Sequence, residues 1–186
     1  MRVIGGEAGG QPLVAPRDRE TRPISDRVKE ALFGMLGTRV IGARVLDLYA
    51  GSGAIGIEAL SRGAAHATFV ERGPAAVAAI RENLRRTGFP ARAEVQARAV
   101  ERFLAAEPAV GWDLVVLDPP YAERTLGPVL DRVPPILAAD GLVVVKHFWR
   151  TEVPIPPGLA ATRRRRFGET ALTFLESTAS RSEEES

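Results

Sequence analysis

The sequence predicts an α/β fold, Rossmann-like, in which a mostly parallel sheet lies between two layers of helices. Short apolar runs alternate with segments of helical periodicity from Arg44 to Val145, the order that produces parallel sheets. The runs are apolar at nearly every position, which is typical of strands buried on both faces. The first of them breaks into a glycine turn, Gly51-Ser52-Gly53, that leads directly into a helical pattern.

The segments before this alternation predict a small extension. Residues 2–4 and 12–14 flank a glycine-rich connection and predict a β-hairpin. A helix is expected next, with Ser25 as its N-cap and Gly37 at its end, because apolar residues between them recur on one helical face. We expect this helix to pack across the main sheet.

The remaining elements follow the same logic. The predicted strands are residues 45–49, 67–71, 93–96, 113–117 and 141–145, and the predicted helices are 54–61, 74–86, 100–106 and one between 126 and 137. Two strand-like segments, 162–167 and 170–176, predict an antiparallel hairpin added to the sheet edge. The chain is thereby divided into an extension (1–24), one main domain (25–176) and a low-complexity tail (177–186) that is expected to be disordered.

The composition fits a protein with a single core. The chain has 186 residues, of which 45% are apolar, and no cysteine, which excludes disulfides and thiolate metal sites. No stretch approaches the roughly 18 apolar residues of a membrane span, so a cytoplasmic protein without a membrane partner is expected. The net charge of +2 permits a nucleic-acid partner without requiring one.

The glycine turn predicts a ligand site. Gly51, Gly53 and Gly56 have the spacing of the dinucleotide fingerprint, although such a match alone is weak and a turn used only for strand-to-helix packing remains an alternative. Asp47, at the end of the preceding strand, would repel a pyrophosphate and suits a cation. S-adenosylmethionine carries an ammonium and a sulfonium and no phosphate, so it is the expected cofactor.

Acidic residues at two further strand ends complete the expected site. Glu71 ends the second strand, where an acid can accept both hydroxyls of a ribose. Asp118-Pro119-Pro120-Tyr121 directly follows the fourth strand and offers acceptors for an –NH2 group together with an aromatic platform for a planar base. Two acceptors can hold the hydrogens of a conjugated amine so that its lone pair is directed at a methyl donor.

Taken together, five motifs resemble the RsmD family, whose members methylate the exocyclic N2 of a guanine in bacterial 16S ribosomal RNA. They lie at residues 2–6, 21–33, 47–53, 58–64 and 118–121. The resemblance implies a class I S-adenosylmethionine-dependent methyltransferase with a seven-stranded sheet, acting on a flipped base. It also implies a monomer whose partner is 16S ribosomal RNA or the assembling small subunit.

The resemblance also assigns roles to residues, none of them as metal ligands. The catalytic group would be Asp118, Pro119, Pro120 and Tyr121. The cofactor would be bound by Asp47, Tyr49, Gly51, Ser52, Gly53 and Glu71. After the third strand, where many methyltransferases have an acid or amide against the adenine amine, this chain departs from the pattern, and Arg98 and Ala99 would contact the adenine mainly through the backbone. RNA would be bound by Thr21, Arg22 and Arg27, with Arg17 and Arg19 compensating for a hairpin that has Glu7 where the family has basic residues.

Several alternatives remain open from the residues alone. Lys146 stands where an acid is expected and has no assigned role, and the four arginines at 163–166 suit either a solvated face or an RNA contact. A dinucleotide-dependent oxidoreductase is supported by the glycine spacing and Glu71 but opposed by Asp47. An inactive RNA-binding protein, and methyltransferases acting on DNA adenine or protein glutamine, are the other candidates.

Overall fold

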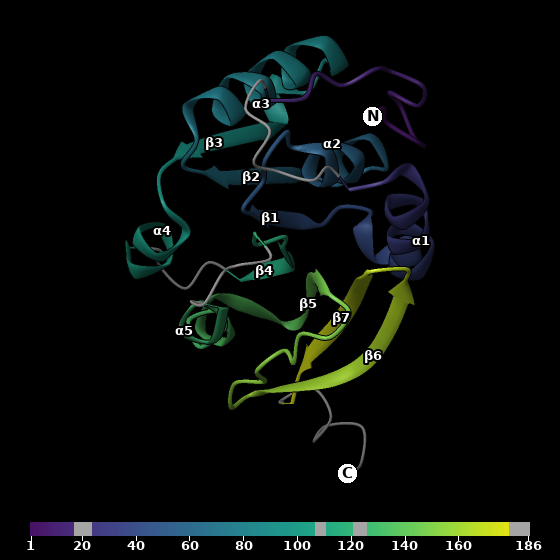
Figure 1. Ribbon diagram of the computed structural model, residues 1–186. Helices are drawn as coiled ribbons and strands as arrows, with labels where there is room; N and C mark the ends of the chain where they lie inside the picture. The colour runs from purple at the N-terminus through teal and green to yellow at the C-terminus, as the bar shows by residue number, and fades with distance from the viewer. Residues whose placement is uncertain (17–23, 107–110, 121–125, 179–186) are drawn as a thin grey trace.

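The computed structural model describes residues 1–16, 24–106, 111–120 and 126–178, and they form one seven-stranded sheet with helices on both faces (Figure 1). The strand order is β3-β2-β1-β4-β5-β7-β6. The first five strands in the chain pair in parallel, whereas β7 pairs antiparallel with both β5 and β6. The strands are β1 (Arg44–Leu48), β2 (His66–Glu71), β3 (Ala93–Ala97), β4 (Trp112–Leu117), β5 (Leu137–Phe148), β6 (Leu159–Phe167) and β7 (Thr170–Ser177). The predicted seven-stranded, mostly parallel sheet is confirmed.

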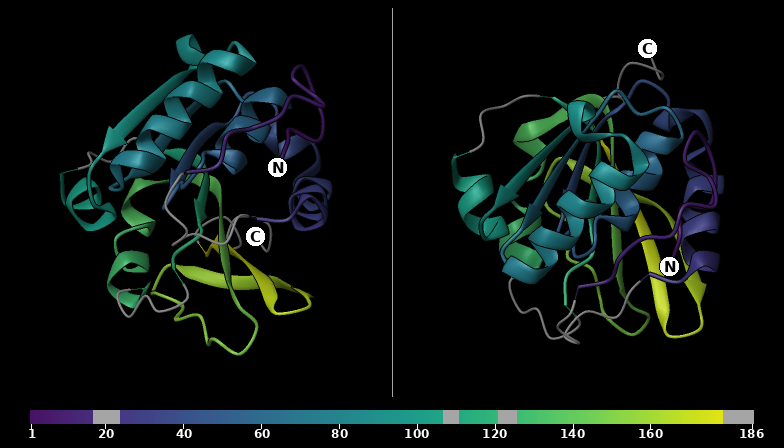
Figure 2. Two further views of the ribbon diagram at one scale, coloured as in Figure 1. Left: turned by 45° about the horizontal axis from the view of Figure 1, so that its top comes forward. Right: turned by 90° about the horizontal axis from the view of Figure 1, so that it is seen from above.

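Two hydrophobic clusters occupy the two faces of the sheet. One face is covered by α1 (Asp26–Leu36), α2 (Ala54–Ser61) and α3 (Pro74–Thr87), and the other by α4 (Val100–Ala106) and α5 (Leu126–Leu130) (Figure 2). Short 3₁₀ turns occur at Gly37–Val40, Pro90–Arg92 and Pro134–Ile136. Side chains of the central strands alternate between the clusters: Val45 packs under α2, for example, and Leu46 and Leu48 on the opposite face. This double burial explains why the strands are apolar throughout.

The helix starts follow the sequence signals. The Ser25 hydroxyl accepts a hydrogen bond from the Val28 amide at 3.3 Å and caps α1. Pro74 occupies the first turn of α3, where its missing N–H costs no hydrogen bond. Residues on the inner face of α1 are buried in the first cluster, so the expected packing of this helix on the sheet is confirmed.

Some boundaries differ from the expectation. Strand β1 ends at Leu48, because Tyr49 has a φ of 60° and leaves the extended conformation. Strand β5 extends from Leu137 to Phe148, well beyond the predicted residues 141–145, because its later polar residues are paired inside the sheet. The predicted N-terminal hairpin has no regular strands, but its two arms are joined by an antiparallel bridge between Arg2 and Pro12 and by backbone hydrogen bonds of Val3 and Leu13.

The N-terminal segment shares the core of the main domain. Val3, Ala8 and Leu13 are buried in the same cluster as α1 and α2. Ser177 belongs to β7, and the rest of the predicted tail, apart from residue 178, lies outside the described residues. The division of the chain at residues 24 and 176 stays a prediction. Within the described ranges, no helix is both long and apolar enough to cross a membrane.

Candidate functional site

Three strands end side by side at the carboxyl edge of the sheet. Leu48 at the end of β1 is in register with Val70 of β2 on one side and Leu117 of β4 on the other. The Asp118 amide donates to the Leu48 carbonyl at 3.3 Å, just as β1 gives way to the glycine turn. The turn and the acids Glu71 and Asp118 are therefore brought to one place, as the sequence predicted.

The glycine turn has a constrained backbone. Tyr49 is, among the described residues, the one non-glycine residue with a positive φ. Such a conformation costs on the order of 1–3 kcal/mol and is found mainly where function requires it. Gly51 has a φ of 56°, and a Cβ placed on it would meet no atom of the described residues within 4 Å. The turn thus borders open space in which a ligand can approach the backbone.

The third glycine of the fingerprint serves packing. A Cβ on Gly56 would lie 2.3 Å from the Phe69 ring, so α2 can approach β2 only because this residue has no side chain. The Gly56 amide also donates to Oδ2 of Asp47 at 2.9 Å. Gly56 therefore has the packing role of the third fingerprint glycine, which does not by itself identify the ligand of the turn.

Asp47 lies in an environment that favours a cationic ligand. Burial raises the pKa of this carboxyl well above its usual range; the Gly56 hydrogen bond opposes the shift, and the carboxylates of Asp118 and Glu71 add to it. Oδ1 of Asp47 is buried and has no hydrogen-bond partner within the described part of the protein. A positive group placed among the three carboxylates would relieve their repulsion. The ammonium and sulfonium of S-adenosylmethionine fit this group of three carboxylates.

Glu71 connects the glycine turn with the start of α3. One carboxylate oxygen accepts from the Gly51 amide at 2.9 Å and the other from the Gly73 amide at 2.7 Å. Each oxygen keeps a further lone pair with which it could accept from a ribose hydroxyl. The predicted ribose contact remains a prediction.

Asp118 is paired with a buried lysine. Nζ of Lys146, on β5, donates to Oδ1 of Asp118 at 2.5 Å, and the side chains of the lysine and the aspartate are 6% and 21% exposed. Burial raises the pKa of Asp118, and the neighbouring Lys146 charge opposes that shift. No role could be assigned to Lys146 from the sequence alone, although a lysine at the end of an apolar strand is a usable signal of a charged partner.

Both ring nitrogens of His147 are hydrogen-bonded within the sheet. Nδ1 donates to the Phe148 carbonyl at 2.8 Å, which leaves Nε2 to accept from the Thr173 hydroxyl at 2.8 Å. Burial is the main cause of the lowered pKa of this imidazole. These contacts make His147 a structural residue.

The other predicted site residues are placed unevenly. Pro119 is buried, Pro120 and Arg98 are exposed, and Ala99 is half-buried after β3. Arg27 is exposed in the first turn of α1. Tyr121 and the RNA-contact candidates Arg17, Arg19, Thr21 and Arg22 lie outside the described residues, so their roles remain predictions.

A buried polar network ties the N-terminal segment to α2. The Glu58 carboxylate accepts from the amides of Ile4 and Gly5 at 2.7 and 2.9 Å. It also pairs with Lys29 at 3.2 Å and Arg62 at 2.7 Å, and both Lys29 and Glu58 are fully buried. The 58–64 motif therefore holds the segment in place, a function that periodicity could not reveal.

Asn83 of α3 links this segment to the glycine turn. Its Oδ1 accepts from the Val14 amide at 2.7 Å, and its Nδ2 donates to the carbonyls of Val14 and Ser52, each at 2.9 Å. One side chain thus binds both the start of the chain and the predicted cofactor turn.

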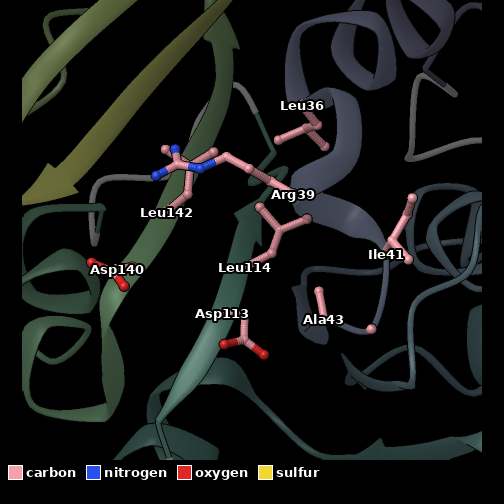
Figure 3. Close-up of a pocket in the computed structure, with 9 residues that line it drawn as sticks. Leu36, Arg39, Ile41, Ala43, Asp113, Leu114, Asp140 and Leu142 are labelled. Atoms are coloured by element: carbon pink, nitrogen blue, oxygen red, sulfur yellow. The ribbon is translucent and has the colours of Figure 1, made fainter.

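A hollow at the opposite edge of the sheet is distinct from this site. It is lined by residues that include Leu36, Arg39, Ile41, Asp113, Asp140 and Leu142, around the amino ends of β1 and β4 (Figure 3). Arg39 is paired with Glu176 and Asp113 accepts from the Arg44 amide. In the described ranges, no group of His, Cys, Asp or Glu side chains is arranged to hold a metal ion.

Comparisons with known proteins agree with this geometry. A family model described as conserved hypothetical protein 95 matches residues 1–176. Ribosomal RNA small subunit methyltransferase D of Escherichia coli K12 is 33% identical over 174 residues, covering 92% of this chain and 87% of that protein. YlbH of Bacillus subtilis is 40% identical over 179 residues, covering 94% and 97%. The solved structure of yhhF from Escherichia coli matches with a TM-score of 0.86 and 32% identity, covering 96% and 98%. The fold is that of class I methyltransferases.

Proposed function

The chain belongs to the RsmD family, and on that premise we propose that it methylates the exocyclic N2 of a guanine in 16S ribosomal RNA with S-adenosylmethionine. The observation that carries the proposal is the Asp118–Lys146 pair beside the glycine turn. The proposal includes a monomeric enzyme that works in the cytoplasm on ribosomal RNA or on the assembling small subunit.

The cofactor would lie on the turn that follows β1. Asp47 and the neighbouring acids would face its positive groups, and the open space at Gly51 leaves room for it against the backbone. Glu71 would accept from the ribose, and the residues after β3, Arg98 and Ala99, would contact the adenine. When bound, S-adenosylmethionine supplies an electrophilic methyl group.

Asp118 would hold the target amine. Lys146 engages Oδ1, so Oδ2 is the oxygen left to accept an N–H of the amine. The Pro119 carbonyl is a second acceptor of the kind that proline-rich turns expose. Fixing both hydrogens localises the nitrogen lone pair and directs it toward the methyl group, so the contribution of the protein is positioning and electrostatics. After transfer, the methylated amine loses one proton to Asp118 or to water.

The competing functions are separated by the same residues. A guanine, an adenine and a glutamine side chain all present a conjugated amine, so Asp118 alone does not choose among them. The family relation favours the ribosomal guanine. A dinucleotide-dependent oxidoreductase is disfavoured, because a pyrophosphate beside three carboxylates would be repelled.

The test is methyl transfer from labelled S-adenosylmethionine to small-subunit ribosomal RNA, both free and in assembled particles, followed by nucleoside analysis. Label in N2-methylguanosine would support cofactor, reaction and target together. Label in another nucleoside would keep the chemistry and reject the guanine. Absence of label in any RNA, with cofactor binding intact, would reject the RNA substrate and leave protein and DNA amines.

A further inference from the structure

The outermost strand of the sheet carries a row of exposed arginines. Residues 163–166 are all arginines, all are exposed, and they lie on β6. Because β5 and β6 both pair antiparallel with β7, they run in the same direction and end at the same edge as Asp118. Arg166 is level with His147, the residue after Lys146, with Ala171 between them, so about two strand spacings, roughly 10 Å, separate their backbones.

Two of these arginines gather around Trp149, just beyond β5. Arg164 donates through Nη2 to the Trp149 carbonyl. The guanidinium carbon of Arg166 lies 3.6 Å from the centroid of the Trp149 ring, and that of Arg150 lies 4.7 Å from it. Together with Thr151 and Glu152 these residues line an open hollow, which we call the Trp149 hollow.

The alternation of side chains leaves Arg163 and Arg165 on the opposite face of β6. Their partners across the pairing with β7 are Phe174 and Leu172, which are buried in the cluster under α1. The row of four arginines is therefore two separate pairs, and only one pair borders the Trp149 hollow.

Within the described residues, the arginine charges of the hollow are not neutralised by ion pairs. In the part of the chain that the structure describes, no carboxylate forms an ion pair with Arg150, Arg164 or Arg166, and Glu152 is the one acid lining the hollow. Some arginines elsewhere are paired, as Arg92 is with Glu7 at 2.8 Å. The hollow thus keeps a net positive charge near the edge of the sheet where Asp118 lies.

We propose that the Trp149 hollow binds the phosphate backbone of the RNA beside the target nucleotide. The proposal rests on the proposed function and extends it to the part of the protein that grips the substrate. A guanidinium held against an indole ring keeps its N–H donors in its own plane, oriented for a phosphate, so little side-chain freedom is lost on binding. Arg166 uses Nε on the Gly168 carbonyl and retains its other donors.

The N-terminal hairpin gives this proposal a second argument. Its turn, residues 5–10, contains no lysine or arginine, and its one charged residue, Glu7, forms an ion pair with Arg92. That turn therefore offers no positive charge to a phosphate backbone. In the described part of the chain, the Trp149 hollow is a surface of the required charge at the catalytic edge.

The test compares two double variants of the same strand. Arg164→Gln/Arg166→Gln removes the pair at the hollow, and Arg163→Gln/Arg165→Gln removes the same charge from the other face. Arg85→Gln/Arg86→Gln on α3, at the far end of the sheet (Figure 1), controls for net charge. Filter binding measures the affinity of each full-length protein for transcribed 16S ribosomal RNA over a range of salt concentrations, and cofactor affinity is measured alongside.

The hollow variant should bind the RNA about tenfold or more weakly, with a salt slope smaller by about 1 to 2. Its cofactor affinity should be unchanged, and both controls should lose less than about threefold. An unchanged affinity for the hollow variant, or an equal loss in the Arg163/Arg165 control, would overturn the proposal. Because binding is read without turnover, a wild-type protein that binds this RNA but transfers no methyl group would reject the proposed function alone.

Discussion

The ammonium of Lys146 and the carboxylate of Asp118 meet at 2.5 Å across two neighbouring parallel strands. The lysine is the strongest opposing influence on a carboxyl whose pKa burial would otherwise raise further. The pair sets the charge and the orientation of the group that we assign to the target amine.

Removing the lysine should change the pH dependence of turnover. In Lys146→Met, the pKa of Asp118 should rise further because the opposing charge is gone. Asp118 would then become protonated at a higher pH than in the wild type. Once protonated, its carboxyl group no longer offers the charged Oδ2 as an acceptor for the target amine. The acidic limb of the kcat profile should move to higher pH, whereas Lys146→Arg should keep it near the wild-type position. A Met variant whose profile keeps its shape at reduced amplitude would show that Lys146 has only a structural role.

Loss of Asp118 should separate chemistry from cofactor binding. Asp118→Ala removes the acceptor for the amine, and kcat should fall by about 100-fold or more. The affinity for S-adenosylhomocysteine, measured by calorimetry, should change little. Asp113→Ala, at the opposite end of the same strand, is the matched control and should retain turnover. Weakened cofactor binding with turnover retained would contradict the assignment of Asp118.

Asp47→Asn should stabilise the cofactor-free protein while weakening cofactor binding. The folded-state pKa of Asp47 is raised, so its contribution to stability is present below the ordinary carboxyl pKa and is lost as the pH rises through the raised value. At neutral pH the charged aspartate is therefore unfavourable, and Asn removes that charge. The Tm should rise, at about 2–4 °C per kcal/mol for a chain of this size.

The gain in Tm should shrink as the pH falls below the ordinary carboxyl range, because the wild-type aspartate is then neutral as well. Calorimetric scans of both proteins at neutral and acidic pH measure this difference. An equal gain at both values would mean that charge is not its cause. Cofactor affinity intact in the variant would remove Asp47 from the proposed cofactor site.

The buried pair of Lys29 and Glu58 should respond unequally to substitution. Glu58→Gln leaves a fully buried lysine without its carboxylate, and the free energy of unfolding should fall by about 3–5 kcal/mol. Lys29→Met should cost less, because Glu58 still accepts from Arg62 and from two backbone amides. Denaturant unfolding of both variants provides the comparison. A larger loss in the Lys29 variant would contradict this division.

Much of the fold could be predicted because its signals are local. Ser25 and Pro74 mark helix starts that the structure confirms, and the apolar runs identify the central strands. The end of β5 could not be recognised, because the polarity of Lys146 and His147 is compensated by Asp118 and Thr173, which are distant in sequence. Local pattern can suggest that a buried lysine has a charged partner, but it does not identify that partner.

The same distinction applies to the site. Acids occur at or just after the ends of three predicted strands. Because parallel strands share their carboxyl ends, this pattern predicted that Asp47, Glu71 and Asp118 lie at one edge of the sheet. The roles of Glu58 and Asn83 depend on contacts with residues some 50 to 70 positions away. Those residues appeared in the sequence only as parts of a motif or of a helical face.

The position of β7 has a consequence for the synthesis of this protein. Strand β7, the last in chain order among the described strands, is inserted between β5 and β6, so the apolar edge of β5 has no neighbour until residues 170–177 have emerged from the ribosome. A nascent chain lacking β7 exposes an unpaired strand edge, a template for intermolecular pairing. Completion of the sheet therefore requires residues 170–177, and chains truncated before β7 are expected to aggregate instead of persisting as partly active enzymes.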